Sequence, residues 1–410
     1  MAQDIERSLE PADSPAAPAG AWPVFLVFLR LGCTSFGGPV AHIGYFHDEF
    51  VRRRRWLSER SFVDLVALCQ VLPGPSSSQV GLAIGMTRGG LLGALAAWLG
   101  FTLPSALTLM LFAVGLKAWG AAVPAGALHG LKVVAVAVVA QAVWSMARKL
   151  CAGVVRALMA LLTAAAVLLW PTSIAQLGAL VIAGCLGMSL FEPAPIAADD
   201  ELPVSLARRT GGALLALFLV LLAGMPLLLG IWPDHALAVA NAFYRTGSLV
   251  FGGGHVVLPM LQTAVVEPGW VANESFLAGY GLTQAMPGPL FTFAAFLGAS
   301  MQAPPTSWAG GALCLVSIFL PSFLLVFGAL PFWATLRTNR RVQSALTGVN
   351  AAVVGLLLAA LYRPVWTGAV FGIGDVCFVL LALAALMAWR LPPWLVVVVC
   401  AAAGWLLASI

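Results

Sequence analysis

Long apolar stretches alternate with short polar ones along most of this chain. Runs long enough to form membrane-spanning helices are predicted at 90–116, 126–148, 154–170, 174–191, 211–230, 306–334, 343–363, 367–388 and 393–409. A helix needs about 20 mainly apolar residues to cross the hydrocarbon core of a bilayer. The pattern therefore predicts an all-α polytopic membrane protein.

A helix-breaking motif interrupts this apolar pattern in each half of the chain. Pro73-Gly74-Pro75 is followed by three serines and Gln79, and Pro287-Gly288-Pro289 repeats the motif later. Within lipid, irregular backbone is tolerated only where it is buried in protein or lines a water-filled cavity. We therefore expect the two breaks to lie at the functional centre.

The two halves align with each other in order, which indicates a duplication. The ungapped match of 28–38 with 243–253 is followed by Trp56 with Trp270, Gln70 with Gln284, Pro104-Ser105 with Pro321-Ser322, and 128–132 with 346–350. Both copies of the first match end in Phe-Gly-Gly, a second break.

The arginines predict that the two copies have opposite orientations. Arginine-rich short loops face the cytoplasm, so 52–55 is placed there. Its partner, 266–269, carries no positive charge, whereas the weakly basic loop near 123–124 aligns with the arginine-rich loop 337–341. Opposite charge bias is typical of inverted-topology repeats, the plan of many secondary transporters.

The side of the membrane assigned to each arginine also predicts that some segments enter the membrane and return to the same side. Segment 61–88 begins after the cytoplasmic arginines and ends at Arg88, where the next span must also start from the cytoplasm. It should therefore be a re-entrant hairpin of two half-helices, as should 21–52, 235–266 and 275–302. The alternative is that each hairpin is a single broken transmembrane helix.

This topology divides the chain into four parts. We expect a disordered cytoplasmic tail at 1–20, a first repeat at 21–190, a cytoplasmic linker at 191–210 and an inverted second repeat at 211–410. The N-terminus is predicted to be cytoplasmic and the C-terminus periplasmic.

Composition narrows the function. The chain is 61% hydrophobic and 9% charged, with a net charge of +5 that comes mainly from arginines beside apolar runs, so no nucleic-acid partner is expected. Seven scattered cysteines show no metal-ligand spacing, and we expect no metal and no cofactor. Gly372-Ile373-Gly374-Asp375 resembles an intramembrane protease signature but lacks a second aspartate motif, and other enzyme motifs are absent. The chain is not expected to be an enzyme.

The breaks are suited to binding an anion. Each second half-helix would point its N-terminus, with unpaired N–H groups, toward the centre. Arg30 and Arg245, aligned between the repeats, could add two guanidinium groups, or could instead be structural helix caps. The predicted substrate-binding residues are Arg30, Gly37, Gly38, Pro73, Gly74, Pro75, Ser76, Ser77, Gln79, Arg245, Gly252, Gly253, Pro287, Gly288 and Pro289.

Four ionisable residues near the breaks or within spans are candidates for proton coupling. Lys132 lies within a predicted span, and Asp64 near the mouth of the Pro-Gly-Pro hairpin. His42 follows the first Phe-Gly-Gly break and His255 the second. Asp48 and Glu49 are also ionisable and lie nearby, but beside four arginines they are more typical of an ion-paired rim.

The ordered combination of these motifs resembles the chromate transporter family in its long two-domain form, over nearly the whole chain after residue 20. The resemblance rests on the 28–39 motif, the basic segment before Trp56, the Pro-Gly-Pro break and the second copies of each. It implies a bacterial inner-membrane protein that exports chromate, driven by the proton gradient. Gly254 in place of Pro39, and 290–292 in place of the serines, predict an asymmetric site.

Two alternatives remain open at this point. The substrate could be another oxyanion such as sulfate, which has nearly the same size and charge, or the protein could be a lipid-phosphate flippase. The sequence also leaves the oligomeric state open, with a homodimer as one option.

Overall fold

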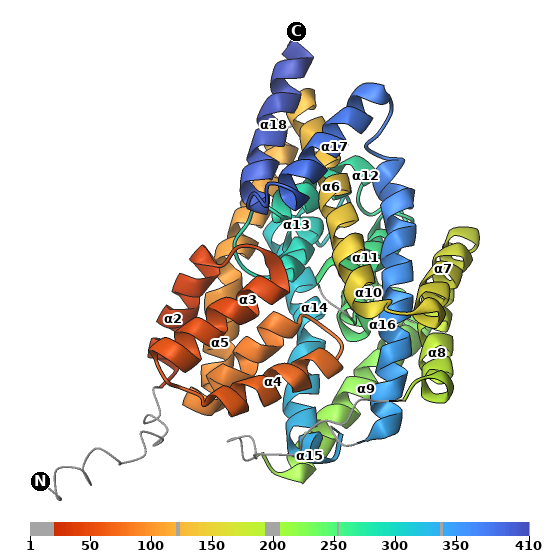
Figure 1. Ribbon diagram of the computed structural model, residues 1–410. Coiled ribbons are helices and arrows are strands. Elements are labelled where there is room, and N and C mark those ends of the chain that lie inside the picture. The colour runs from red at the N-terminus through yellow and green to blue at the C-terminus, as the bar shows by residue number, and fades with distance from the viewer. Residues whose placement is uncertain (1–19, 120–123, 193–205, 252–253, 337–338, 410) are drawn as a thin grey trace, which may run out of the picture.

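The computed structural model describes residues 20–119, 124–192, 206–251, 254–336 and 339–409, and this part of the chain is helical, with no strand (Figure 1). The first half contains α2 (Ala21–Thr34), α3 (Gly38–His47), the π-helix η2 (Asp48–Arg53), α4 (Glu59–Val71), α5 (Ser76–Trp119), α6 (Ala125–Leu150), α7 (Val154–Leu169) and α8 (Ser173–Leu190). The predicted tail, except Gly20, and most of the predicted linker lie outside the described residues.

The second half repeats this order after a connecting helix, α9 (Arg208–Ile231). It contains α10 (His235–Leu249), η4 (Gly254–Val256), α11 (Val257–Val265), α12 (Asn273–Thr283), η5 (Leu290–Thr292), α13 (Phe293–Ser300), α14 (Ser307–Ala329), η6 (Leu330–Phe332), α15 (Trp333–Leu336), α16 (Arg340–Ala360), η7 (Leu361–Trp366), α17 (Ile373–Met387) and α18 (Pro393–Ser409). Helix, break and helix follow one another at all four predicted hairpins.

Aromatic contacts in the first half show that the chain reverses at each break. Phe28 of α2 packs against Phe46 and Phe50, with ring centroids 5.6 and 5.0 Å apart, so α3 runs back along α2. Arg88 ends the second hairpin with its guanidinium 5.1 Å from the ring centroid of Trp56, which precedes that hairpin. Helix α5 then continues across a kink at Gly89 and Gly90. The predicted reversals are therefore present.

The second half returns to the matching tryptophan. The N–H of Gln302, after the last hairpin, donates to the carbonyl of Trp270 at 3.2 Å. His235, at the start of α10, packs edge-on against the same Trp270 ring. Trp56 and Trp270 thus mark equivalent points where the hairpins of each half begin and end.

Helices occupy all nine predicted span positions. Five are long and apolar enough to cross a membrane by length and composition, namely α5, α6, α9, α14 and α16 with its extension. Helices α7, α8, α17 and α18 are shorter apolar helices of 15 to 18 residues. Only 6% of the most apolar 18-residue stretch of α9 is buried, which suits a connecting helix whose surface faces lipid. Helix α9 connects the two repeats, and in the predicted topology its additional crossing of the membrane inverts the second repeat.

The last helix of each half packs on the other half's central helix. Helix α6 packs against α18 and α17, while its counterpart α16 packs against α8 and α7 (Figure 1). A Cβ on Gly130 of α6 would clash with the carbonyl of Cys400, and one on Gly348 of α16 would clash with that of Ala183. Aligned glycines therefore allow the same close contact twice, as two-fold symmetry requires.

The two Pro-Gly-Pro breaks are held by reciprocal hydrogen bonds. The N–H of Gly74 donates to the carbonyl of Val250 at 2.7 Å, and the N–H of Gly288 donates to the carbonyl of Ser35 at 2.9 Å. Val250 and Ser35 are aligned residues of the two repeats. Each break is thus anchored on the other half of the protein, and these reciprocal contacts agree with the predicted duplication.

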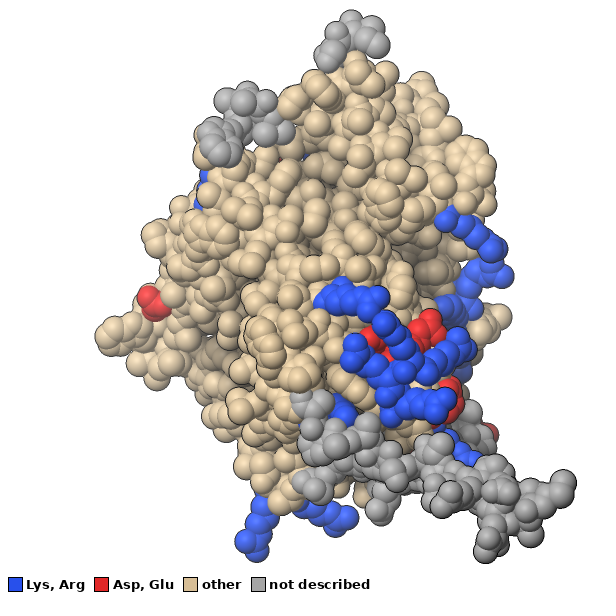
Figure 2. Space-filling model, turned by 90° about the vertical axis from the view of Figure 1, so that its left-hand side faces the viewer, with Lys and Arg blue, Asp and Glu red and all other residues tan. Residues whose placement is uncertain are grey.

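The basic segment after α3 is an ion-paired rim. Arg52 pairs with Asp48 at 3.0 Å, and Arg53 and Arg54 pair with Glu49 at 3.1 and 2.6 Å. Figure 2 views the side that carries α2, α3 and α4, where Lys and Arg gather with Asp and Glu while most of the surface is uncharged. This is the surface expected of a protein embedded in a bilayer.

Candidate functional site

All four breaks in the chain meet around one cavity of about 760 Å³. Its lining includes Gly37 and Gly38 from the first break, Gly74 and Ser76 from the second, and Gly288 from the fourth. Gly254 and His255 represent the third, while Gly252 and Gly253 lie outside the described residues. Sequence segments far apart in the chain therefore build one central site, as the motifs predict.

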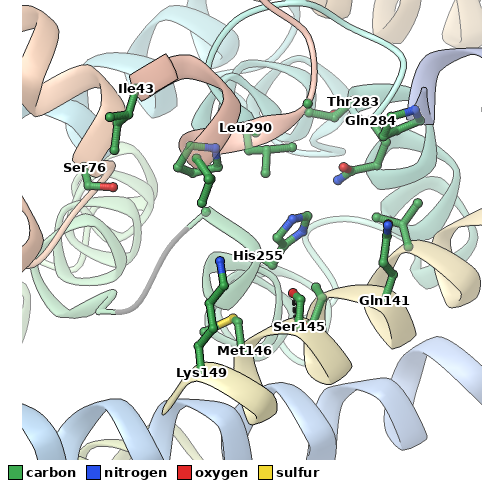
Figure 3. A pocket seen from close by; sticks show the side chains of 18 of the residues that line it. Ile43, Ser76, Gln141, Ser145, Met146, Lys149, His255, Thr283, Gln284 and Leu290 are labelled. Atoms are coloured by element: carbon green, nitrogen blue, oxygen red, sulfur yellow. Dashed lines mark hydrogen bonds between the residues drawn. The ribbon is translucent and has the colours of Figure 1, made fainter. Parts of the chain in front are cut away.

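Helix α6 forms a polar wall of this cavity. Gln141, Ser145 and Lys149 follow one another at helical spacing along it and rise into the same space as His255 and Gln284 (Figure 3). Asn350 of α16 also lines the space. These side chains offer hydrogen-bond donors of several kinds, which suits an oxygen-rich solute.

The charge of the cavity is positive. Among the described residues that line it, the charged ones are Lys149, at the end of α6, and Arg390, between α17 and α18, and none is acidic. Neither cation forms an ion pair within the described part of the chain. Both side chains are exposed, so they can attract an anion from solution, and the cavity is suited to an anion.

A buried amide side chain stabilises the backbone conformation of the second break. Nε2 of Gln79, which is fully buried, donates to the carbonyl of Pro73 at 2.6 Å. Gly74 has φ of 118°, a conformation that glycine adopts at low cost, and Ser76 then begins α5 at the cavity wall. The first turn of α5 thus presents its unpaired N–H groups close to the cavity.

The glutamines aligned between the two repeats both line the cavity. Gln70 lies one residue before the end of α4, and Gln284 directly follows α12. Nδ1 of His255 lies 2.9 Å from the hydroxyl oxygen of Tyr280, which fixes the imidazole at the cavity wall. Among the described residues, His255 is the histidine that lines the cavity.

Several predicted site residues lie behind the wall instead of in it. Ser77 is buried, and its hydroxyl lies 3.3 Å from Nδ1 of the buried His42, whose Nε2 is 3.2 Å from the carbonyl of Ser35. Gln79 supports Pro73, as described above. Pro73, Pro75, Pro287 and Pro289 shape the breaks without lining the cavity. These residues position the wall.

The two aligned arginines do not reach the cavity. Arg30 is exposed on α2, on the outside of its hairpin. Arg245 lines a separate pocket of about 250 Å³ with Asn241 and Gln176. The prediction that they bind substrate stays a prediction, and this geometry places the cationic side chains of the cavity at Lys149 and Arg390 instead.

Two predicted coupling residues also lie outside the cavity lining. Nζ of Lys132 is 3.8 Å from Oε1 of Glu274, near the start of α12. Asp64 is half-buried on α4. Near Lys132, Nε2 of His129 lies 2.6 Å from Oδ1 of Asp375, and the N–H of Phe371 donates to the other oxygen at 2.9 Å. Asp375, in the first turn of α17, thus joins this helix to His129 of α6 and to the segment before α17.

Sequence reasoning missed most of the polar side chains that line the cavity. Lys149, Arg390, Gln141 and Ser145 are not among the residues that the sequence predicts at the site. The signals that could have found them are the helical spacing of 141, 145 and 149, and the alignment of Gln70 with Gln284.

Comparison with known proteins gives a consistent result. A family model described as "Chromate transporter" matches residues 22–189 and again residues 237–405. A "Chromate transport protein" of Pseudomonas aeruginosa is 30% identical over 98% of this chain and 97% of its own. A "Probable chromate transport protein" of Synechococcus elongatus is 28% identical over 92% of this chain and 93% of its own. No solved structure matches the chain.

Proposed function

The chain belongs to the chromate transporter family, and from this premise we propose that it is a secondary transporter that exports chromate across the bacterial inner membrane, driven by the proton gradient. It is a transporter and not an enzyme. The proposed substrate site is the central cavity, with Lys149, Arg390, Ser76, Gln70 and Gln284 as the polar contacts.

One observation carries the proposal: the cavity at which the four breaks meet has cationic and neutral polar side chains and no acidic one among the described residues that line it. Chromate is a tetrahedral dianion, and such groups are held by cations, amides, hydroxyls and helix N-termini. A lipid-phosphate flippase would instead need a groove open to the bilayer along its side.

The orientation of the protein is part of the same proposal. The rim formed by 48–54 and the ends of α6 and α8 would face the cytoplasm, with the C-terminus periplasmic. The repeats would span 21–190 and 211–410, joined by the linker at 191–210, and the two matches to the family model support this division. Lys149 and Arg390 would then lie on the cytoplasmic side and collect chromate for export.

Transport into everted vesicles tests the proposed substrate. Vesicles that contain the protein should accumulate labelled chromate when a proton gradient is imposed, and an uncoupler should abolish this accumulation. Excess sulfate measures selectivity, because it would strongly inhibit chromate uptake if the site bound sulfate as tightly as chromate. Vesicles that take up no more chromate than vesicles without the protein would contradict the proposal.

A separate prediction concerns the coupling residue. His255→Gln should abolish uphill chromate accumulation, because the substitution removes the imidazole that lines the cavity and can carry a proton there. Exchange of internal for external chromate, which needs no net proton movement, should stay within about twofold of the parent. The measurement is labelled chromate uptake with and without a pH gradient.

His235→Gln is the matched control, since His235 packs against Trp270 and does not line the cavity. It should keep both activities. Equal loss of exchange and uphill transport in His255→Gln would show that His255 has a different role, and Lys132 and Asp64 would then be the next residues to replace.

A further inference from the structure

A second, smaller pocket occupies the symmetry-related position of the central cavity. It measures about 140 Å³ and lies between α16, the α7–α8 connection and α11, whereas the cavity lies between α6, the α17–α18 connection and α3. Helices α16, α7, α8 and α11 are the repeat counterparts of α6, α17, α18 and α3 respectively. The two spaces are thus related by the exchange of the two repeats.

The correspondence extends to individual residues. The α6 residues that line the cavity include Val138, Gln141, Ala142 and Ser145. The small pocket is lined by Leu356, Ala359 and Ala360 of α16 and by Arg363 of η7, which continues α16. Extending the alignment of Gly130 with Gly348 without a gap pairs these residues one to one. The same stretch of helical surface lines both spaces, and Arg363 takes the place of Ser145.

The small pocket opens at the surface, where Glu267 and Arg363 are exposed, but it does not continue inward to the breaks as the cavity does. None of the described break residues lines it, so it does not lead to the centre. Nε2 of Gln176 on α8 donates to Oγ1 of Thr263 on α11 at 2.9 Å, and both side chains are buried. Helix α11 packs against α8 and α16, while α3 and α6 face each other across the cavity.

We propose that this pocket is the closed second half of the translocation path, that it opens when the cavity closes, and that Arg363, which lines it beside Glu267, receives the oxyanion there once this half is open. The proposal rests on the proposed transport function. An inverted repeat can exchange the conformations of its two halves at little net cost, because each half then makes the contacts that the other made before. The hydrogen bond between Gln176 and Thr263 must break for α11 to separate from α8, and it is the gate of this half.

Cross-linking the gate tests the proposal. In a background with the native cysteines replaced, the double variant Gln176→Cys and Thr263→Cys should form a disulfide under oxidation. Chromate transport should then fall at least about tenfold and recover on reduction, because a path that opens alternately on two sides stops when one side is locked. Each single cysteine variant, oxidised in the same way, is the control and should keep its transport. Full cross-linking without loss of transport would overturn the proposal.

Labelling gives a readout that does not depend on the substrate. Thr263→Cys, buried here, should react slowly with a membrane-impermeant thiol reagent, from the same face as the exposed position of Glu267→Cys. A labelled Glu267→Cys with no labelling of Thr263→Cys would overturn the gate. If the parent protein carried no chromate, the proposed function would fail, but this labelling would still decide whether the pocket opens.

Arg363→Gln separates an anion-binding role from a structural one. It should raise the KM for chromate about tenfold when substrate is supplied from the Glu267 side, because the charge-assisted hydrogen bond from Arg363 to the substrate is lost there. The KM for chromate supplied from the cavity side should stay unchanged, because Arg363 does not contact the substrate on that side. An equal change on both sides, or none, would exclude Arg363 as the receiving residue.

Discussion

Replacing Lys149 and Arg390 together with glutamine should raise the KM for chromate about a hundredfold, with each single replacement raising it about tenfold. Hydrogen bonds to charged groups contribute about 1.5 to 3 kcal/mol, and a tenfold change in affinity corresponds to about 1.4 kcal/mol. The two residues are the charged ones among the described residues that line the cavity, so no other cation there compensates for their loss. The measurement is the initial rate of labelled chromate uptake into everted vesicles over a range of concentrations.

Arg148→Gln is the matched control, because Arg148 precedes Lys149 on α6 and is exposed without lining the cavity. It should leave the KM unchanged, and Lys149→Arg should restore most of the affinity lost in Lys149→Gln by restoring the charge. If the double variant transported chromate with the parent's KM, the substrate would bind elsewhere, and Arg30 and Arg245 would become the leading candidates again.

The second large effect is expected at the Pro-Gly-Pro break. Gly74→Ala should greatly lower both the yield of folded protein and its thermal stability in detergent. The φ of 118° would cost a residue with a side chain about 1 to 3 kcal/mol in strain. The new methyl group would also lie 2.7 Å from Nε2 of Gln79 and from Oγ of Ser322, which adds overpacking of about 1 to 3 kcal/mol.

The buried surroundings make this clash hard to relieve. Gln79 can move away only by breaking its hydrogen bond to Pro73, and Ser322 is fully buried. Gly153→Ala is the control for backbone strain alone, because Gly153 has φ of 94° with no atom within 4 Å of the position of an added Cβ. If both variants lost the same stability, packing around Gly74 would not matter, and the break would be more adaptable than its contacts indicate.

Much of the architecture could be predicted from the sequence because it follows from charge and duplication. The four arginines at 52–55 and the parity of the spans required chain reversals, and Phe28 meeting Phe46 and Phe50 shows one of them. The repeat alignment paired Gly130 with Gly348, and both glycines make the same close helix contact. Aligned residues therefore reported the shared scaffold reliably.

The same reasoning was less informative about which side chains line the cavity. Arg30 and Arg245 align as closely as the glycines do, yet neither lines the cavity. Lys149 and Arg390 have no charged repeat partner, and a basic residue at a helix end is also what cytoplasmic topology requires. Which face of a helix points inward depends on packing against distant segments, and the linear pattern does not contain that information. The scaffold is symmetric, while the charged chemistry is not.

The reciprocal hydrogen bonds of the two breaks have a consequence for biogenesis. The N–H of Gly74 donates to the carbonyl of Val250, and the N–H of Gly288 donates to the carbonyl of Ser35. Neither bond can form until the ribosome has made α9 and the start of the second repeat. The first repeat must therefore enter the membrane with its central loops hydrated or held by the insertion machinery. It completes its fold only when the second repeat has been inserted beside it.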